Sequence, residues 1–111
     1  MLNSGALIAI RCRISRGGFS SERVFRVTTP EKVEHVGAAP VEYFFDENQQ
    51  GLPLEPPPRG VSLPGLVAAR VVEQNHNTVL VSVPSGEVLR VATNEVTEYP
   101  KGTGAHVPVQ P

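Results

Sequence analysis

Residues 66–99, LVAARVVEQNHNTVLVSVPSGEVLRVATNEVTEY, decide the fold of this chain. Three apolar runs in this stretch are separated by two short segments, residues 75–77 and 84–86, and a fourth run ends at Tyr99. Valine-rich runs bounded by Asn, Gly, Pro and Ser are typical of β-strands joined by tight turns. The stretch therefore predicts an antiparallel sheet made of four consecutive strands.

The two turns predict the register of this sheet. Asn tolerates the left-handed backbone conformation that ends a three-residue loop, so residues 75–77 suit such a loop. Pro84 presets the backbone of a type I turn, and Gly86 adopts the left-handed conformation without a Cβ clash, so residues 84–86 suit one better. Three-residue loops pair Val71 with Val81, Val81 with Leu89, and Val79 with Val91.

This register gathers one set of apolar side chains on a single face, because side chains alternate along a strand. The set is Val67, Ala69, Val71, Val79, Val81, Val83, Leu89 and Val91. A two-residue loop at either turn would shift the pairing by one residue and turn an apolar set to the wrong face. The other face holds Leu66, Val72, Leu80 and Val88, so we expect the N-terminal half to cover part of it.

Residues 6–52 are predicted to form an N-terminal hairpin and a third strand. Polar and apolar residues alternate over residues 6–15, two glycines at 17–18 signal a turn, and residues 22–27 return. A turn at these glycines pairs Ile10 with Phe25, Ile8 with Val27, and Arg13 with Glu22. The predicted buried face is Ile8, Ile10, Ile14, Phe25 and Val27. Residues 28–32 then turn around Pro30, and residues 41–45 form the third strand.

The remaining segments complete a single small domain over residues 1–99. Residues 53–64 are a proline-rich connector that we expect to run extended over the surface. Residues 93–95 are expected to make a short 3₁₀ turn, and residues 100–111 a flexible tail. A chain of 111 residues with 40% hydrophobic residues can bury one core without disulfide bonds.

The segment 65–99 resembles the second half of SH3-like small barrels, the broad class that includes Tudor and KOW modules. The resemblance rests on a glycine followed by Val-x-Ala-x-Val-Val, a hairpin, Val-Leu-Val-x-Val-Pro-x-Gly, and two further strands. It implies an all-β domain, an SH3-like antiparallel barrel or open sandwich with an added N-terminal hairpin. Tyr99 is the only aromatic residue of the segment, so the aromatic cage that holds methylated side chains is missing. Because many functions share this class of fold, the resemblance implies no activity.

We predict no catalytic, metal or cofactor site. His35, His76 and His106 have no metal-ligand spacing and are interpreted as exposed loop residues. Cys12 is the only cysteine and lies on the predicted apolar face, which indicates a buried structural thiol. The carboxylates occur mostly in polar turns, and the two glycines at 17–18 join strands rather than open a helix, unlike a phosphate-binding loop. We therefore expect a protein that is not an enzyme.

The charge distribution is the main hint about function. The net charge is −1, but residues 1–29 carry five arginines against Glu22 alone. The predicted register places Arg11, Arg13 and Arg26 on the outer face of the first hairpin, which is the candidate interaction face. It could meet a nucleic-acid backbone or an acidic protein surface. Pairing of these arginines with the acidic remainder of the chain, or with another subunit, is the favoured interpretation.

We expect a non-catalytic binding or assembly module whose partner is a protein or a second copy of the chain. The alternative is a nucleic-acid-binding small barrel that uses the arginine face, although no aromatic residues are interleaved there for base stacking. A small enzyme of unidentified class is the third hypothesis. The apolar run at residues 6–10 is too short for a signal peptide or a membrane span, so a soluble, cytoplasmic protein is expected.

Overall fold

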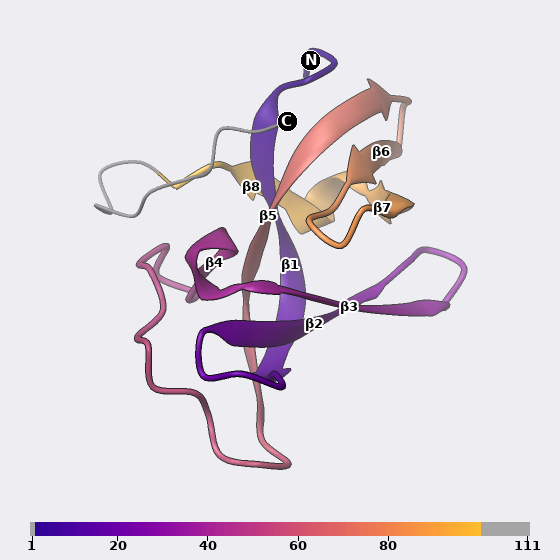
Figure 1. The fold of residues 1–111 in the computed structure, drawn as a ribbon. Coiled ribbons are helices and arrows are strands. Elements are labelled where there is room, and N and C mark those ends of the chain that lie inside the picture. Colours follow the sequence, from indigo (N-terminus) through magenta and orange to yellow (C-terminus); the bar gives the residue numbers. More distant parts are fainter. Residues whose placement is uncertain (1, 101–111) are drawn as a thin grey trace.

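The computed structural model describes residues 2–100 as one antiparallel sheet of eight strands that curls into a half-barrel (Figure 1). The strands are β1 (Leu7–Arg16), β2 (Glu22–Thr28), β3 (Glu34–Pro40), β4 (Phe44–Phe45), β5 (Ser62–Gln74), β6 (Thr78–Ser82), β7 (Val88–Ala92) and β8 (Val96–Glu98). Two 3₁₀ helices, η1 (Val41–Tyr43) and η2 (Thr93–Glu95), precede β4 and β8. The prediction of a single all-β domain is confirmed.

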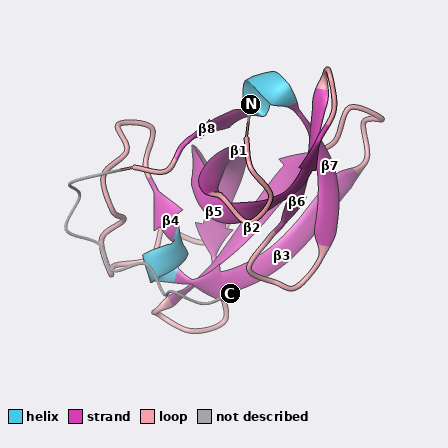
Figure 2. Cartoon of the chain, turned by 90° about the horizontal axis from the view of Figure 1, so that it is seen from above, coloured by secondary structure: helices cyan, strands magenta, loops and turns pink. Residues whose placement is uncertain are grey.

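The sheet order is β3-β2-β1-β5-β6-β7, with β4 paired to β5 and β8 paired to β1. One edge of β1 thus has two neighbours, because residues 13–16 pair with β2 and residues 8–10 pair with β8. This second pairing brings the end of the described chain back to its first strand. Viewed from above, the sheet wraps around a common interior (Figure 2).

The predicted pairing of β5, β6 and β7 is confirmed. Val71 lies opposite Val81, Val81 opposite Leu89, and Val79 opposite Val91. All eight residues predicted to share the interior face are buried. The second turn is the predicted three-residue loop, because the Val83 N–H donates to the Glu87 carbonyl oxygen at 3.0 Å and Gly86 has a φ of +95°.

The first turn is not the predicted three-residue loop. Gln74 lies opposite Val79, and the Asn75 N–H donates to the Thr78 carbonyl oxygen at 2.9 Å, which leaves only two residues in the loop. A register shift between Val71 and Glu73 compensates for this. A β-bulge adds one residue to one strand, so the shorter loop does not turn the valines outward. The loop is one residue shorter than predicted and the strand contains one extra residue, so the two differences cancel. The valines therefore lie on the predicted face.

The register of the first hairpin differs from the prediction by four residues. Ile14, rather than Ile10, lies opposite Phe25, and Arg13 faces Arg26 instead of Glu22. The loop is longer than two glycines, because the Glu22 carboxylate turns back to accept the Gly18 N–H at 2.7 Å. Since four is an even number, every side chain keeps its face. The predicted buried set, Ile8, Ile10, Ile14, Phe25 and Val27, is accordingly buried.

The third strand is Glu34–Pro40, which the sequence prediction missed. The predicted strand at 41–45 is instead η1 followed by the two residues of β4. β3 contains Gly37-Ala38-Ala39-Pro40 and so carries a weak strand signal. A Cβ on Gly37 would lie 2.7 Å from Phe25 Cζ, so β3 is placed by its close packing on β2. β5 begins at Ser62, three residues before the predicted start of that sheet.

Two apolar clusters stabilise the fold. The main cluster fills the curl of the sheet and includes Phe25 and Phe44, whose ring centroids are 6.0 Å apart. The second joins Ala9, Phe45 and Leu66 on the other face, with Tyr99 packed edge-on against Phe45 at 5.3 Å. Phe45 is the residue of the N-terminal half that covers part of the outer face, as expected. Tyr99, near the C-terminal end of the described chain, covers more of it.

Side chains connect the free edge of β3 to the turn between β6 and β7. His35 Nδ1 lies 3.7 Å from Glu87 Oε1. A Cβ on Gly37 would lie 2.8 Å from Ser85 Oγ, so the two segments touch at this point. β3 and the β6–β7 turn therefore approach each other through side-chain contacts, and no backbone hydrogen-bond ladder joins them in the described residues.

Candidate functional site: the connector groove

The segment between β4 and β5 forms a long loop beside the end of β1 (Figure 1). A groove of about 570 Å³ lies between this loop and the strands, which we name the connector groove. Ligand pockets in proteins usually measure about 300–1,000 Å³. The lining residues of the groove used below are Ile14, Arg16, Arg23, Val61 and Leu63, together with Pro53 and Pro56–Pro58 from the loop.

Arg23 attaches the loop to the sheet. Its side chain is buried at 1% exposure, and its Nη1 donates to the Ser20 and Glu22 carbonyl oxygens at 2.7 and 2.8 Å. Its Nη2 donates to the Pro53 and Leu54 carbonyl oxygens at 3.0 and 2.9 Å. A proline-rich loop has few N–H groups of its own to pair these carbonyls, so the guanidinium supplies the missing donors. Four bonds from one side chain thus join two loops.

The charge of Arg23 is not balanced by a carboxylate within the described residues. Burial, and secondarily the nearby charge of Arg16, lowers the pKa of Arg23, yet an arginine stays protonated at neutral pH. Carbonyl dipoles therefore stabilise a full positive charge next to the groove.

Arg16 lies opposite Arg23 in the β1–β2 ladder and lines the same groove. Its Nε donates to the Pro57 carbonyl oxygen at 3.1 Å. Within residues 2–100, no acceptor is bonded to its Nη1 or Nη2 atoms. The two carboxylates of the lining, Asp46 and Glu55, form no ion pair with it, and Asp46 Oδ1 instead accepts the N–H groups of Asn48 and Gln50. Arg16 and Arg23 therefore place two positive charges side by side at the groove.

Exposed apolar side chains contribute to the lining of the connector groove. Eight large hydrophobic residues are exposed in the described part of the chain, and two of them line this groove. Val61 and Leu63 line the groove itself. Leu54 and Phe19, at 71% and 73% exposure, adjoin the carbonyl groups that Arg23 binds. Contiguous exposed apolar surface on a small protein marks sites of interaction.

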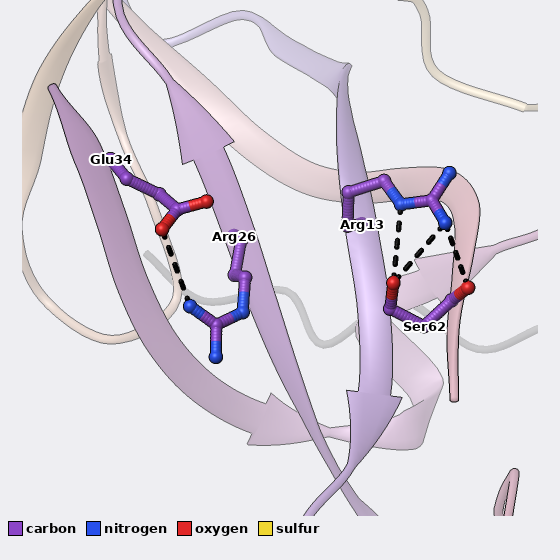
Figure 3. Close-up of polar contacts among 4 residues, drawn as sticks. All are labelled: Arg13, Arg26, Glu34 and Ser62. Carbon is purple, nitrogen blue, oxygen red and sulfur yellow. Dashed lines mark hydrogen bonds and ion pairs between the residues drawn. The ribbon is translucent and has the colours of Figure 1, made fainter. Parts of the chain in front are cut away.

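The predicted arginine face forms, but much of its charge is engaged within the chain. Arg13 and Arg26 are direct neighbours across β1 and β2, and Figure 3 shows their guanidinium groups pointing away from each other. Arg13 Nη2 donates to the Ser62 carbonyl oxygen at 2.8 Å, and Arg26 Nη1 lies 3.3 Å from Glu34 Oε1. Arg11 is exposed and has no polar partner among the described residues.

Cys12 lies in the main apolar cluster, and burial raises the pKa of its thiol from 9.0 to about 12. The folded thiol holds its proton at pH values where the unfolded thiol ionises. Its contribution to stability is therefore complete below pH 9 and is lost as the pH rises from 9 to about 12.

We expect Cys12 in the folded protein to react with an aromatic disulfide reagent at pH 8 at least about a hundredfold more slowly than in urea, because the thiolate is the nucleophile. Absorbance of the released thiol measures both rates. Equal rates in buffer and urea would contradict a buried thiol.

The histidines do not converge on a site. His35 lies beside Glu87, His76 is in the β5–β6 turn, and His106 falls outside the described residues. Residues 2–100 contain no cluster of three His, Cys, Asp or Glu side chains with metal-binding geometry. Over the same residues, no helix is long and apolar enough to cross a membrane. Comparison with known proteins gives no match to a family model, a curated protein or a solved structure.

Proposed function

We propose that this protein is a non-catalytic binding module that docks a partner protein at the connector groove. The observation that carries the proposal is a groove of about 570 Å³ whose lining includes Val61 and Leu63, two of the eight exposed large hydrophobic residues in residues 2–100. Fully desolvated apolar contacts at the centre of an interface supply most of its binding free energy. Among the described residues, the apolar lining of the connector groove is best suited to supply such contacts.

The chemistry of the groove supports binding rather than catalysis. Its ionisable lining groups are Arg16, Arg23, Asp46 and Glu55. Arg23 and Asp46 are engaged by backbone groups, and the remaining arginine and carboxylate form no hydrogen-bonded acid–base pair. General acid–base catalysis needs such groups within hydrogen-bond reach of the reacting atom. An apolar lining instead favours recognition of an apolar side chain.

The alternative, a nucleic-acid-binding barrel that uses Arg11, Arg13 and Arg26, has weaker support. Two of these arginines already bind partners within the chain, so a phosphate would have to compete with Ser62 or Glu34. Arg11 is the member of the face best placed to meet a phosphate. Release of condensed counterions dominates such binding, so it would weaken steeply with added salt.

We further infer that residues 65–99 complete an SH3-like small barrel. The inference is supported by two consecutive hairpins, by η2, and by the return of β8 to pair with β1. In this interpretation β2, β3, β4 and the connector are an elaboration inserted between β1 and β5. The insertion supplies most of the lining of the connector groove.

The proposal predicts that Leu63→Glu removes a bound partner while Val88→Glu does not. Both residues are exposed, at 48% and 53%, but only Leu63 lines the groove. Tagged wild type and variants are incubated with lysate of the source cells, and bound proteins are quantified by mass spectrometry. We expect at least about a tenfold loss for Leu63→Glu, as for a buried interface residue.

Two results would contradict the proposal. One is a partner that Leu63→Glu retains in full. The other is recovery of nucleic acid that elutes with salt and is lost in Arg11→Glu/Arg13→Glu, which would support the alternative. Light scattering of the purified wild type and Leu63→Glu shows whether the partner is a second copy of the chain.

A further inference from the structure

We propose that the connector groove recognises a segment of the partner protein in which an aliphatic side chain stands next to a carboxylate. The aliphatic group fills the groove over Ile14 and Leu63, and the carboxylate binds the free Nη groups of Arg16. This inference rests on the proposed function, since it names the chemistry of the partner that docks there.

The shape and lining of the groove favour an aliphatic side chain. Ile14 belongs to the main apolar cluster and lies at the groove, so a ligand side chain would extend the core of the protein. Pro53 and Pro56–Pro58 line the groove from the loop. Proline has a fixed φ, and Arg23 holds the loop at two carbonyls, so little conformational entropy remains to be lost on binding.

The charge at the groove favours a carboxylate beside that side chain. Arg16 uses its Nε for the loop, which leaves the Nη groups for a ligand. Arg23 contributes a second positive charge that is buried and whose Nη1 and Nη2 groups already bind four carbonyl acceptors. Two adjacent cations raise the local potential, and hydrogen bonds between a guanidinium and a carboxylate are about twice as strong as neutral ones. A ligand carboxylate would reduce the electrostatic repulsion between Arg16 and Arg23.

Asp46 and Glu55 are the opposing charges in the groove lining, and Glu55 is the one that accepts no hydrogen bond within the described residues. Its carboxylate is exposed and forms no ion pair within the described residues, and Asp46 faces its own turn. Removing the Glu55 charge with Glu55→Gln should therefore strengthen carboxylate binding rather than weaken it. A groove that selected cations would respond in the opposite direction.

A polypeptide fits this surface better than a small carboxylic acid does. Phe19 and Leu54 are more than two-thirds exposed, and Arg23 at the groove binds the carbonyl groups of Leu54 and of Ser20, which follows Phe19 in the chain. A small acid would fill the groove and leave both side chains in water. A peptide chain lying across the groove would cover them, and the charge complementarity described above orients it.

The test is a titration of ¹⁵N-labelled protein, followed by NMR, with the peptide acetyl-Ser-Leu-Glu-Leu-Ser-amide. Matched peptides carry Gln or Lys in place of Glu. We expect shifts confined to amides around Arg16, Val61 and Leu63, and an affinity for the Glu peptide about five- to tenfold above that for the Gln peptide. The Lys peptide should bind more weakly than either.

Arg16→Gln should abolish the preference for Glu over Gln and leave the affinity for the Gln peptide unchanged. Arg59→Gln is the matched control, because Arg59 carries the same charge on the connector but does not line the groove. Arg16→Lys keeps the charge without the planar fork and should retain part of the preference. Circular dichroism and thermal unfolding establish that each variant is folded before titration.

The outcomes separate this inference from the proposed function. Equal affinity for the Glu and Gln peptides at the groove would overturn the carboxylate inference and leave the docking site standing. Shifts with sodium octanoate but with none of the peptides would also overturn it, in favour of a small acid. If no peptide binds and Leu63→Glu retains every partner, both proposals fail together.

Discussion

Leu89→Asp is expected to leave the protein largely unfolded at 25 °C, whereas Val88→Asp should change the free energy of unfolding by less than about 0.5 kcal/mol. The two residues are neighbours in β7, yet Leu89 is 2% exposed and Val88 is 53% exposed. Burying a carboxylate without a partner costs several kcal/mol, which is comparable to the whole stability of a small domain, about 5–15 kcal/mol.

Urea unfolding followed by circular dichroism measures this pair. Leu89 lies opposite Val81 at the centre of the interior face, so the comparison tests the register on which the fold depends. A folded Leu89→Asp protein with near wild-type stability would mean that this face is open to water. Destabilisation by Val88→Asp alone would mean that the two faces are exchanged.

Arg23→Ala is expected to lower the free energy of unfolding by about 3–5 kcal/mol, because four hydrogen bonds to a charged group are lost and each such bond contributes about 1.5–3 kcal/mol before the cost of burying the charge is subtracted. The substitution leaves four carbonyl groups without their donor, at Ser20, Glu22, Pro53 and Leu54. It also removes a large buried side chain next to the connector groove. Urea unfolding gives the free energy, and NMR signals of residues 53–61 show whether the loop leaves the sheet.

The matched control is Arg26→Ala, which removes an arginine of the same strand. Arg26 and Glu34 are both about half exposed, and such surface ion pairs contribute about 0–1 kcal/mol. Arg23→Lys should recover little stability, because one ammonium group cannot reach carbonyls of two loops at once. Similar losses for Arg23→Ala and Arg26→Ala would show that the loop is held by something other than the guanidinium.

The arginine face shows how far charge patterning can be trusted. The sequence places Arg11, Arg13 and Arg26 on one side of a hairpin, and they do lie there despite a register that is wrong by four residues. Their partners were not predictable, since Ser62 is 49 positions from Arg13 in the chain. Within residues 2–100, the expected pairing of these arginines with the acidic remainder of the chain occurs once, between Arg26 and Glu34.

The sequence alone did not predict the connector groove. The proline-rich segment was predicted to be a connector that runs extended over the surface. The groove depends on hydrogen bonds from Arg23 to the Pro53 and Leu54 carbonyl oxygens, which lie 30 and 31 residues away in the chain. No local sequence pattern predicts these bonds. β3 was missed for the same reason, because its small residues form a strand only where they pack against Phe25.

The sequence by itself determined which apolar side chains of the two predicted sets are buried. Side chains alternate between the two faces of a strand, so the four-residue difference in the first hairpin changes no face, and the bulge in β5 offsets the one-residue difference in the first turn. Tertiary structure alone decided where strands meet, how β8 closes on β1, and where the connector lies. Those outcomes depend on packing and on backbone hydrogen bonds between distant segments. Almost every residue other than proline carries the same backbone donor and acceptor, so the sequence does not specify which segments pair.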